Sequence, residues 1–301
     1  MITFSIAGFI LGTILGSLLK VLADRSLSGK SFFGRSYCTF CKKTLGWYDL
    51  IPLFSYILLK GRCRYCKKRI GKEYIVVEII SGVLIGYLFF TSFSNLAPLS
   101  DPLKLILFSS ELIFKIFFII ILLSLFLTDY KKMLIPDRIV LPSIIVSIVY
   151  LLVLAVYKVI YLYIYLQDHP IGKYLLPPHS SYFQDRVFSN IQYFFTHLGA
   201  GLGLGAFFLL LILVTKGKGM GGGDVKLGVF MGISLGFINT AIATMLAFFI
   251  GAAFSIILII LRKRKLGSVI PFGPFLVLGS LIALFWGSQI WQWFIEFNLV
   301  P

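Results

Sequence analysis

Long apolar runs alternate with short polar and basic connections along the whole chain. Several of these runs exceed the roughly 18 apolar residues that a helix needs to cross a membrane. We predict spans at about residues 2–22, 75–94, 104–128, 139–166, 197–215, 225–238, 240–261 and 270–294. The sixth run is short for a span and rich in glycine. The pattern indicates an all-α polytopic membrane protein with about eight transmembrane helices.

The composition supports a membrane protein. The chain has 301 residues, of which 58% are hydrophobic and 13% charged, and its mean hydropathy is +0.95. No soluble core of this size requires so much apolar surface. We do not expect the first run, Ile2 to Leu19, to be a signal peptide, because its first lysine, Lys20, comes after the run and not before it.

The formal net charge of +16 is distributed unevenly along the chain. Eight spans would place the connections 20–74, 129–138, 216–226 and 262–265 on one side of the membrane. All but five of the 28 Lys and Arg residues lie in them, the exceptions being Lys104, Lys115, Lys158, Lys173 and Arg186. Since basic loops stay in the cytoplasm, we predict that this side is cytoplasmic and that the N-terminus is outside. Attraction to anionic membrane lipid is a secondary effect, and we expect no nucleic-acid partner.

The pattern divides the chain into three regions. They are the first transmembrane helix at 1–22, a small cytoplasmic domain at 23–73 and a seven-helix membrane bundle at 74–301 with an external loop at 167–190. We interpret His169 and His179, in the external loop, as solvated side chains in preference to metal ligands. His197 opens the fifth predicted span, and we expect it at the membrane interface.

All four cysteines lie in the cytoplasmic domain, as CTFC (Cys38 and Cys41) and CRYC (Cys63 and Cys66). Two C-x-x-C pairs about twenty residues apart are typical of zinc ribbons, where two turns supply four thiolates in a tetrahedron. A reducing cytoplasm disfavours structural disulfides, and a metal would stabilise a segment with so small a core. We predict a closed, structural zinc site. Redox chemistry and metal-free thiols are the alternatives.

Two aspartates lie at the predicted cytoplasmic ends of spans. Asp129 ends the third span in LFLTDYKKMLIPDRIVL, and Asp224 begins the sixth in GMGGGDVKLGVF. Ionisable residues at membrane depth are costly and are therefore functional candidates. Taken singly, Asp129 is explained as an interfacial helix end and Asp224 as a helix cap. Taken together on one membrane face, they indicate a catalytic pair.

Two close carboxylates share one proton, because both cannot ionise without a large cost. One then acts as a general base toward water, and the other polarises the scissile carbonyl and later protonates the leaving amine. The glycines of GKGMGGGDVKL, residues 217–227, would let an extended substrate lie beside the loop without side-chain clashes. We expect Gly223 to need a positive φ or a close backbone approach.

In this order, the motifs resemble those of the bacterial type IV prepilin peptidases, the leader peptidase/N-methyltransferase group of GxGD-type aspartyl proteases. TDYKKMLIPD at 128–137 is similar to their first catalytic motif and GMGGGDVKLG at 219–228 to their second. IPFGPFLVLG at 270–279 is similar to their closing motif. The paired cysteines and YIVVEIISG at 74–82 resemble their N-terminal domain and second span.

The resemblance implies that Asp129 and Asp224 are the catalytic pair. It implies cleavage of the basic leader of type IV prepilins or pseudopilins at the cytoplasmic face of the inner (cytoplasmic) membrane. It also implies methylation of the new N-terminus with S-adenosylmethionine, which is usually attributed to the N-terminal cytoplasmic domain. The sequence contains no glycine-rich nucleotide motif that would support this second activity independently.

Two further carboxylates and two rival functions are left open. We interpret Asp137, which follows Pro136, as a structural residue in the first turn of a helix. Glu78 lies one turn inside the second span, where it could pair with a basic side chain or meet a substrate amine. The rival functions are a peptidase without methyltransferase activity and a non-enzymatic membrane scaffold or transporter. A transporter more often has paired repeats, and none is evident around the two aspartates.

Overall fold

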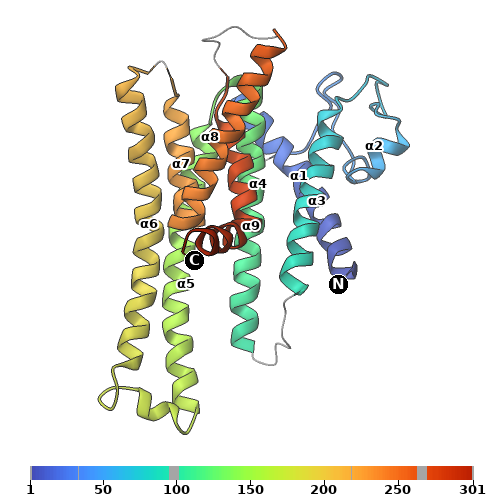
Figure 1. Ribbon diagram of the computed structural model, residues 1–301. Helices are drawn as coiled ribbons and strands as arrows, with labels where there is room; N and C mark the ends of the chain where they lie inside the picture. The colour runs from blue at the N-terminus through green and yellow to red at the C-terminus, as the bar shows by residue number, and fades with distance from the viewer. Residues whose placement is uncertain (1, 33, 95–101, 218, 263–269, 300–301) are drawn as a thin grey trace. The chain divides into compact units, whose positions relative to one another are not determined.

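The computed structural model describes residues 2–32, 34–94, 102–217, 219–262 and 270–299 (Figure 1). The α-helices are α1 (Ile2–Leu27), α2 (Phe54–Leu58), α3 (Glu73–Ser94), α4 (Pro102–Lys132), α5 (Asp137–Asp168), α6 (Tyr182–Val214), α7 (Gly222–Leu235), α8 (Phe237–Ile260) and α9 (Gly273–Leu299). Two 3-10 helices are η1 (Trp47–Asp49) and η2 (Gly172–Leu175). Within these ranges the only β-type pairings are two isolated bridges, so the all-α prediction is confirmed.

Seven of these helices are long and apolar enough to cross a membrane, namely α1, α3, α4, α5, α6, α8 and α9. The chain is therefore a multi-pass membrane protein. The predicted sixth span corresponds to α7, which has 14 residues. At 1.5 Å per residue α7 is about 21 Å long, which is shorter than the roughly 30 Å hydrocarbon core.

The start of α6 differs from the prediction. α6 begins at Tyr182, so the second part of the segment 167–190, which we expected to be a loop, is helical. His197 consequently lies well inside α6 and is buried, with its Nδ1 2.9 Å from the carbonyl oxygen of Ile233 in α7. His197 therefore does not open the helix, because hydropathy marks the apolar part of a helix and not its polar first turns. Its expected position at the membrane interface stays a prediction.

The chain forms two compact units. The first contains Met1–Asp101 and Phe108–Ile139, and the second contains Pro102–Leu107 and Val140–Pro301. The first unit thus combines α1, the cysteine-containing segment, α3 and most of α4. The second holds most of α5 and all of α6 to α9. Of the basic connection predicted at 262–265, residues 263–265 lie outside the described residues.

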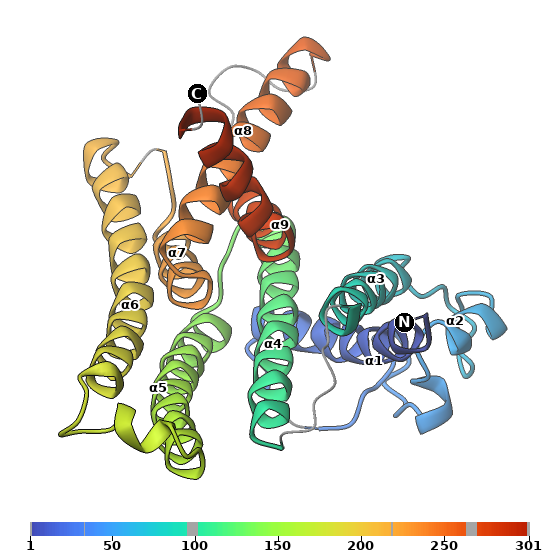
Figure 2. The same cartoon turned by 60° about the horizontal axis from the view of Figure 1, so that its bottom comes forward.

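In the first unit, α1 and α3 lie side by side (Figures 1 and 2). Gly8, Gly12 and Gly16 recur every fourth residue of α1 and face α3. A Cβ at Gly12 would lie 2.5 Å from the carbonyl oxygen of Ser81, and one at Gly16 would collide with the Ser81 hydroxyl. Small residues at this spacing let two membrane helices approach closely without a hydrophobic driving force.

In the second unit, α6 and α7 pack in the same way (Figures 1 and 2). A Cβ at Gly232 of α7 would lie 2.5 Å from the Cα of Gly201 in α6. One residue, Gly236, then separates α7 from α8. Its φ of 76° is one that side chains rarely adopt, and a Cβ there would lie 2.7 Å from Nε2 of His197. Gly236 therefore permits the sharp break after the short helix that carries Asp224.

Candidate active site and metal centre

Asp129 lies in the last turn of α4, in the first unit, and is 6% exposed. Ser124 and Thr128 of the same helix are also buried, and their hydroxyls donate to carbonyls of α4. The helix ends just after Lys132, where Met133 has a φ of 52° and its N–H donates to the Asp129 carbonyl oxygen at 2.7 Å. The carboxylate is thus held at the predicted end of the third span.

A network of two lysines and two carboxylates surrounds this end of α4. Lys131 lies two residues after Asp129, and its Nζ is 2.6 Å from Glu73 of α3 and 3.2 Å from Asp24 of α1. The Nζ of Lys20, a side chain that is 2% exposed, is 2.6 Å from Asp24 and 3.4 Å from Glu73. The network ties α1, α3 and α4 together beside Asp129. Sequence reasoning missed it, because only the Lys20–Asp24 pair has the local i,i+4 spacing that a sequence reveals.

Asp224 is the third residue of α7, in the second unit, and is 8% exposed. Its Oδ2 accepts from the N–H of Gly221 at 3.3 Å, and its own N–H donates to the Gly221 carbonyl at 3.1 Å. Gly221, and not Asp224, is therefore the N-cap residue. Gly223 lies inside α7 in helical conformation and is not among the glycines with a positive φ. A positive φ therefore does not explain why glycine occupies this position.

The two aspartates occupy different compact units. The structure describes each in its own surroundings, and their pairing remains a prediction. Each is buried and each lies within one turn of a helix end. Asp137 begins α5 as expected, in the first turn, where a carboxylate stabilises the helix dipole.

The four cysteines are brought together between α1 and α3. Their sulfurs all lie within 4.8 Å of one another, and the Sγ atoms of Cys38 and Cys66 are 3.8 Å apart. Thiolates bound at about 2.3 Å to a tetrahedral zinc lie about 3.8 Å apart. Cys38 and Cys63 are buried, and Cys41 is exposed. The four residues therefore have the number, type and spacing of a structural zinc site.

Both pairs reach this arrangement through the same local turn. The Cys38 N–H donates to the carbonyl of Lys43, and the Cys63 N–H donates to that of Lys68. In each turn the fourth residue after the first cysteine, Lys42 or Lys67, has a φ near the left-handed region, at 60° and 57°. The isolated bridges Tyr37–Thr44 and Arg62–Arg69 close the two loops. Two equivalent turns facing each other are what a zinc ribbon requires.

The pKa values of the clustered thiols also favour the binding of a cation. Burial opposes ionisation of Cys38, but hydrogen bonds from the backbone of Cys41 and from neighbouring thiols outweigh it and lower the pKa of Cys38 to about 7. At Cys66 a backbone hydrogen bond at Lys68 favours the thiolate, but burial and the other thiols raise its pKa to about 11. One thiolate therefore forms readily and a further one is disfavoured. A divalent cation removes that penalty, because it stabilises all four charges together.

Comparison with known proteins shows the family to which the chain belongs. Residues 10–92 match the Bacterial Peptidase A24 N-terminal domain, and residues 183–256 match the Type IV leader peptidase family. The Prepilin leader peptidase/N-methyltransferase of Aeromonas salmonicida (strain A449) is 30% identical over 264 residues, which cover 87% of this chain and 75% of that protein. The chain belongs to the type IV leader peptidase family. The protein of the same name from Bacillus subtilis (strain 168) is 28% identical over 295 residues, 97% of this chain and 98% of its own.

The two matched ranges cover most of the candidate residues of this type IV leader peptidase family member. The first contains all four cysteines, Glu78 and the helices α1 and α3. The second contains Asp224 with its glycine turn, and Asp129 lies between the two ranges. No solved structure matches the chain.

Proposed function

We propose that the protein is an intramembrane aspartyl peptidase that cleaves the leader of type IV prepilins or pseudopilins and then methylates the new N-terminus with S-adenosylmethionine. The observation that carries this proposal is the similarity to prepilin leader peptidase/N-methyltransferases, which covers 75% of one relative and 98% of another. The site supports it with two buried carboxylates at helix ends and a cluster of four cysteines.

In this mechanism Asp129 and Asp224 are the catalytic residues and share one proton. The ionised carboxylate takes a proton from water, whose oxygen attacks the scissile carbonyl. The protonated carboxyl group polarises that carbonyl and then gives its proton to the departing amine as the C–N bond breaks. The burial of both side chains strengthens these interactions, because little water screens them.

The glycine turn before Asp224 supports binding of an extended peptide. A Cβ at Gly222 would meet nothing within 4 Å in the part of the chain that the structure describes, and one at Gly221 would meet only Asp224 Oδ2 at 4.0 Å. Packing in this part of the second unit therefore does not require glycine at these positions. We propose that the space next to the carboxylate is kept for the substrate backbone.

We propose that residues 23–73 form a zinc-stabilised cytoplasmic domain and residues 74–301 the catalytic membrane bundle. Cys38, Cys41, Cys63 and Cys66 would hold the zinc, which, with four thiolate ligands, stabilises the fold and takes no part in the reaction. We further propose that the protein lies in the inner (cytoplasmic) membrane, with its N-terminus outside and both aspartates facing the cytoplasm, because basic connections remain inside.

Incubation of the purified protein with a prepilin tests this function directly. A shorter product on a gel is expected, and mass spectrometry after addition of S-adenosylmethionine should show one added methyl group on the new N-terminus. Cleavage without methylation would indicate a peptidase alone. No cleavage of any prepilin or pseudopilin would favour a non-enzymatic scaffold or a transporter.

A further inference from the structure

The short helix α2, in the cysteine-containing segment, exposes apolar side chains on one side. Phe54, Ile57 and Leu58 are 58%, 66% and 63% exposed, and their i, i+3 and i+4 spacing places them on the same side of the helix. Two more exposed apolar residues come just before α2, namely Ile51 and Trp47 of η1, which contacts α2. We call these five residues the apolar patch.

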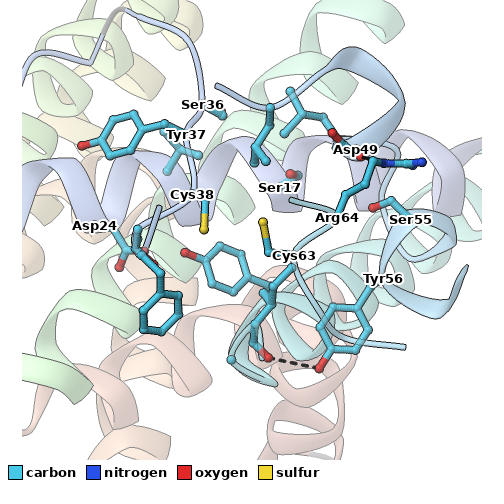
Figure 3. Close-up of a pocket in the computed structure, with 18 of the residues that line it drawn as sticks. Ser17, Asp24, Ser36, Tyr37, Cys38, Asp49, Ser55, Tyr56, Cys63 and Arg64 are labelled. Atoms are coloured by element: carbon cyan, nitrogen blue, oxygen red, sulfur yellow. Dashed lines mark hydrogen bonds and ion pairs between the residues drawn. The ribbon is translucent and has the colours of Figure 1, made fainter. Parts of the chain in front are cut away.

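The opposite side of α2 faces the interior of the first unit. Ser55, Tyr56 and Leu59 line a cavity of about 440 Å³, whose wall also includes residues of α1 and α3 (Figure 3). The Tyr56 hydroxyl donates to the Ile70 carbonyl at 3.5 Å. A surface helix usually turns its polar side to water. In α2 the hydroxyls point inward and the large apolar groups outward, which indicates that something other than water covers the apolar patch.

The chain holds α2 at the depth of a membrane surface. Residues 28–72 join the end of α1 to the start of α3, and both helices have spanning length. Glu78 is the sixth residue of α3 and lies about 7.5 Å along that helix. Its Oε2 accepts from the N–H of Leu53, the residue before α2, at 2.8 Å. α2 therefore begins beside the first turns of a spanning helix and not beyond its end (Figures 1 and 2).

The exposed surface of α3 is apolar at the same depth. Val76, Ile79 and Ile80 are all exposed and lie within one turn of Glu78. Exposed aliphatic side chains on a spanning helix suit lipid. The apolar patch is thus held where the lipid-facing surface of α3 begins.

A basic run follows α2 directly. Residues 60–72, KGRCRYCKKRIGK, contain seven Lys or Arg residues and no Asp or Glu. Among the ion pairs of the described residues, the only one that involves this run joins Arg64 to Asp49. Lys60 and Arg62, the closest to α2, are exposed. The charge of the run is complementary to a surface that carries phosphate groups, and basic residues beside a membrane are attracted by anionic lipid.

We infer that the apolar patch inserts into the membrane surface at which α1 ends and α3 begins, and that anionic phospholipid headgroups pair with the basic run. Interfacial helices are bound in this way, by apolar burial and by attraction to anionic lipid together. α2 has only five residues, but its tether to two spanning helices keeps it at the membrane, so that weak binding suffices. The inference does not rest on the proposed peptidase or methyltransferase activity.

The fluorescence of Trp47 tests the position of the apolar patch. The other three tryptophans, Trp286, Trp291 and Trp293, lie in α9 and are replaced by phenylalanine. The full-length protein is placed in lipid nanodiscs of phosphatidylcholine, alone or mixed with phosphatidylglycerol. Lipids brominated near the headgroup end of their chains should quench Trp47 more than lipids brominated near the chain ends, because interfacial helices lie about 5–10 Å deep. Acrylamide in the water should quench Trp47 severalfold less than it quenches free tryptophan.

A charge variant tests the basic run. Lys60→Gln combined with Arg62→Gln should reduce the quenching by brominated lipid in the mixed nanodiscs and change it little in phosphatidylcholine, because the variant loses charge but no apolar surface. Lys173→Gln combined with Arg186→Gln is the matched control. It removes the same charge from η2 and α6 of the second unit and should have no effect.

An apolar variant tests the contact itself. Ile57→Ser combined with Leu58→Ser should reduce the quenching by brominated lipid in both lipid compositions. Both side chains are exposed, so the melting temperature should remain that of the parent protein and show that the fold is kept.

Three results would overturn the inference in whole or in part. Strong quenching by acrylamide and none by brominated lipid would show that the apolar patch lies in water. Protection of Trp47 from both quenchers would show that protein covers the patch, either another part of the chain or a partner. Quenching by brominated lipid that is the same with and without phosphatidylglycerol would overturn the role of the anionic headgroups.

Discussion

At the scale of single residues, Asp129 and Asp224 have similar local surroundings although they come from different parts of the chain. Each carboxylate is buried and lies within one turn of a helix end, where backbone groups lack intrahelical partners. Such a position keeps an ionisable group near water while most of its surface is covered. Asp137, by contrast, is exposed at the start of α5.

Asparagine substitutions test the predicted pair. Asp129→Asn and Asp224→Asn should each lower the cleavage rate of a prepilin by at least about 1,000-fold, because asparagine cannot exchange the proton. The double variant should be no slower than either single variant, since the two groups act as one unit. Asp137→Asn, the matched control, should retain most of the activity. Cleavage by Asp224→Asn at the wild-type rate would contradict the catalytic pair and leave Asp224 a structural role at the start of α7, where it accepts from the Gly221 N–H.

At the scale of helices, glycines decide which faces meet. α1 packs on α3 and α6 packs on α7 through glycines at close-contact positions, whereas the exposed sides of these helices carry large apolar residues that suit lipid. In the proposed mechanism the α6–α7 contact matters for function, because α7 carries Asp224. A shift of α7 would move the carboxylate with it.

A pair of alanine substitutions tests the α6–α7 contact. Gly232→Ala should lower the melting temperature in detergent and the cleavage rate, because its Cβ would lie 2.5 Å from the backbone of Gly201. Gly203→Ala on α6 meets nothing within 4 Å and should be neutral or stabilising, since alanine favours a helix by about 1 kcal/mol over glycine. Equal effects of the two substitutions would contradict the close packing.

The cysteine-containing segment has few buried apolar side chains of its own, so we expect a metal to stabilise it. Elemental analysis should find about one zinc per chain. The double substitution of Cys38 and Cys41 by serine should remove the zinc and make residues 23–73 sensitive to proteolysis. A variant that loses the metal but keeps wild-type protease resistance would show that the metal has no structural role. Methylation should be reduced more than cleavage, because Cys38 and Cys63 also line a cavity of about 440 Å³ in the first unit.

At the scale of the whole molecule, the alternation of basic and neutral connections predicts the orientation in the membrane. Seven helices are long enough to span the membrane, and α7 is shorter. The topology after α7 therefore depends on whether α7 itself crosses the membrane. Asp129 and Asp224 lie on the same side in either case, because only α5 and α6 cross between them. If α7 does cross, Arg262, just after α8, lies on that side as well, together with most of the basic residues.

Labelling of single cysteines in a background without the native four tests this topology. A cysteine replacing Lys173, in η2, should react with a membrane-impermeant reagent added from outside. A cysteine replacing Arg262, just after α8, should be protected until the membrane is opened. Outside labelling of the Arg262 position would mean that α7 does not cross. Protection of the Lys173 position would mean that the predicted orientation or the count of the preceding spans is wrong.

The sequence by itself determined the helical class, the eight apolar segments, the four cysteines as one cluster and the two aspartates at helix ends. These follow from local rules: length and hydropathy predict spans, and C-x-x-C spacing predicts paired ligands. Only the tertiary structure decided which segments touch. It buried His197 and extended α6 to Tyr182. It also joined Lys20, Asp24, Glu73 and Lys131 in one network and brought the Glu78 carboxylate to the N–H of Leu53. Such contacts join residues far apart in the chain, and they depend on helix packing, which hydropathy and spacing do not encode.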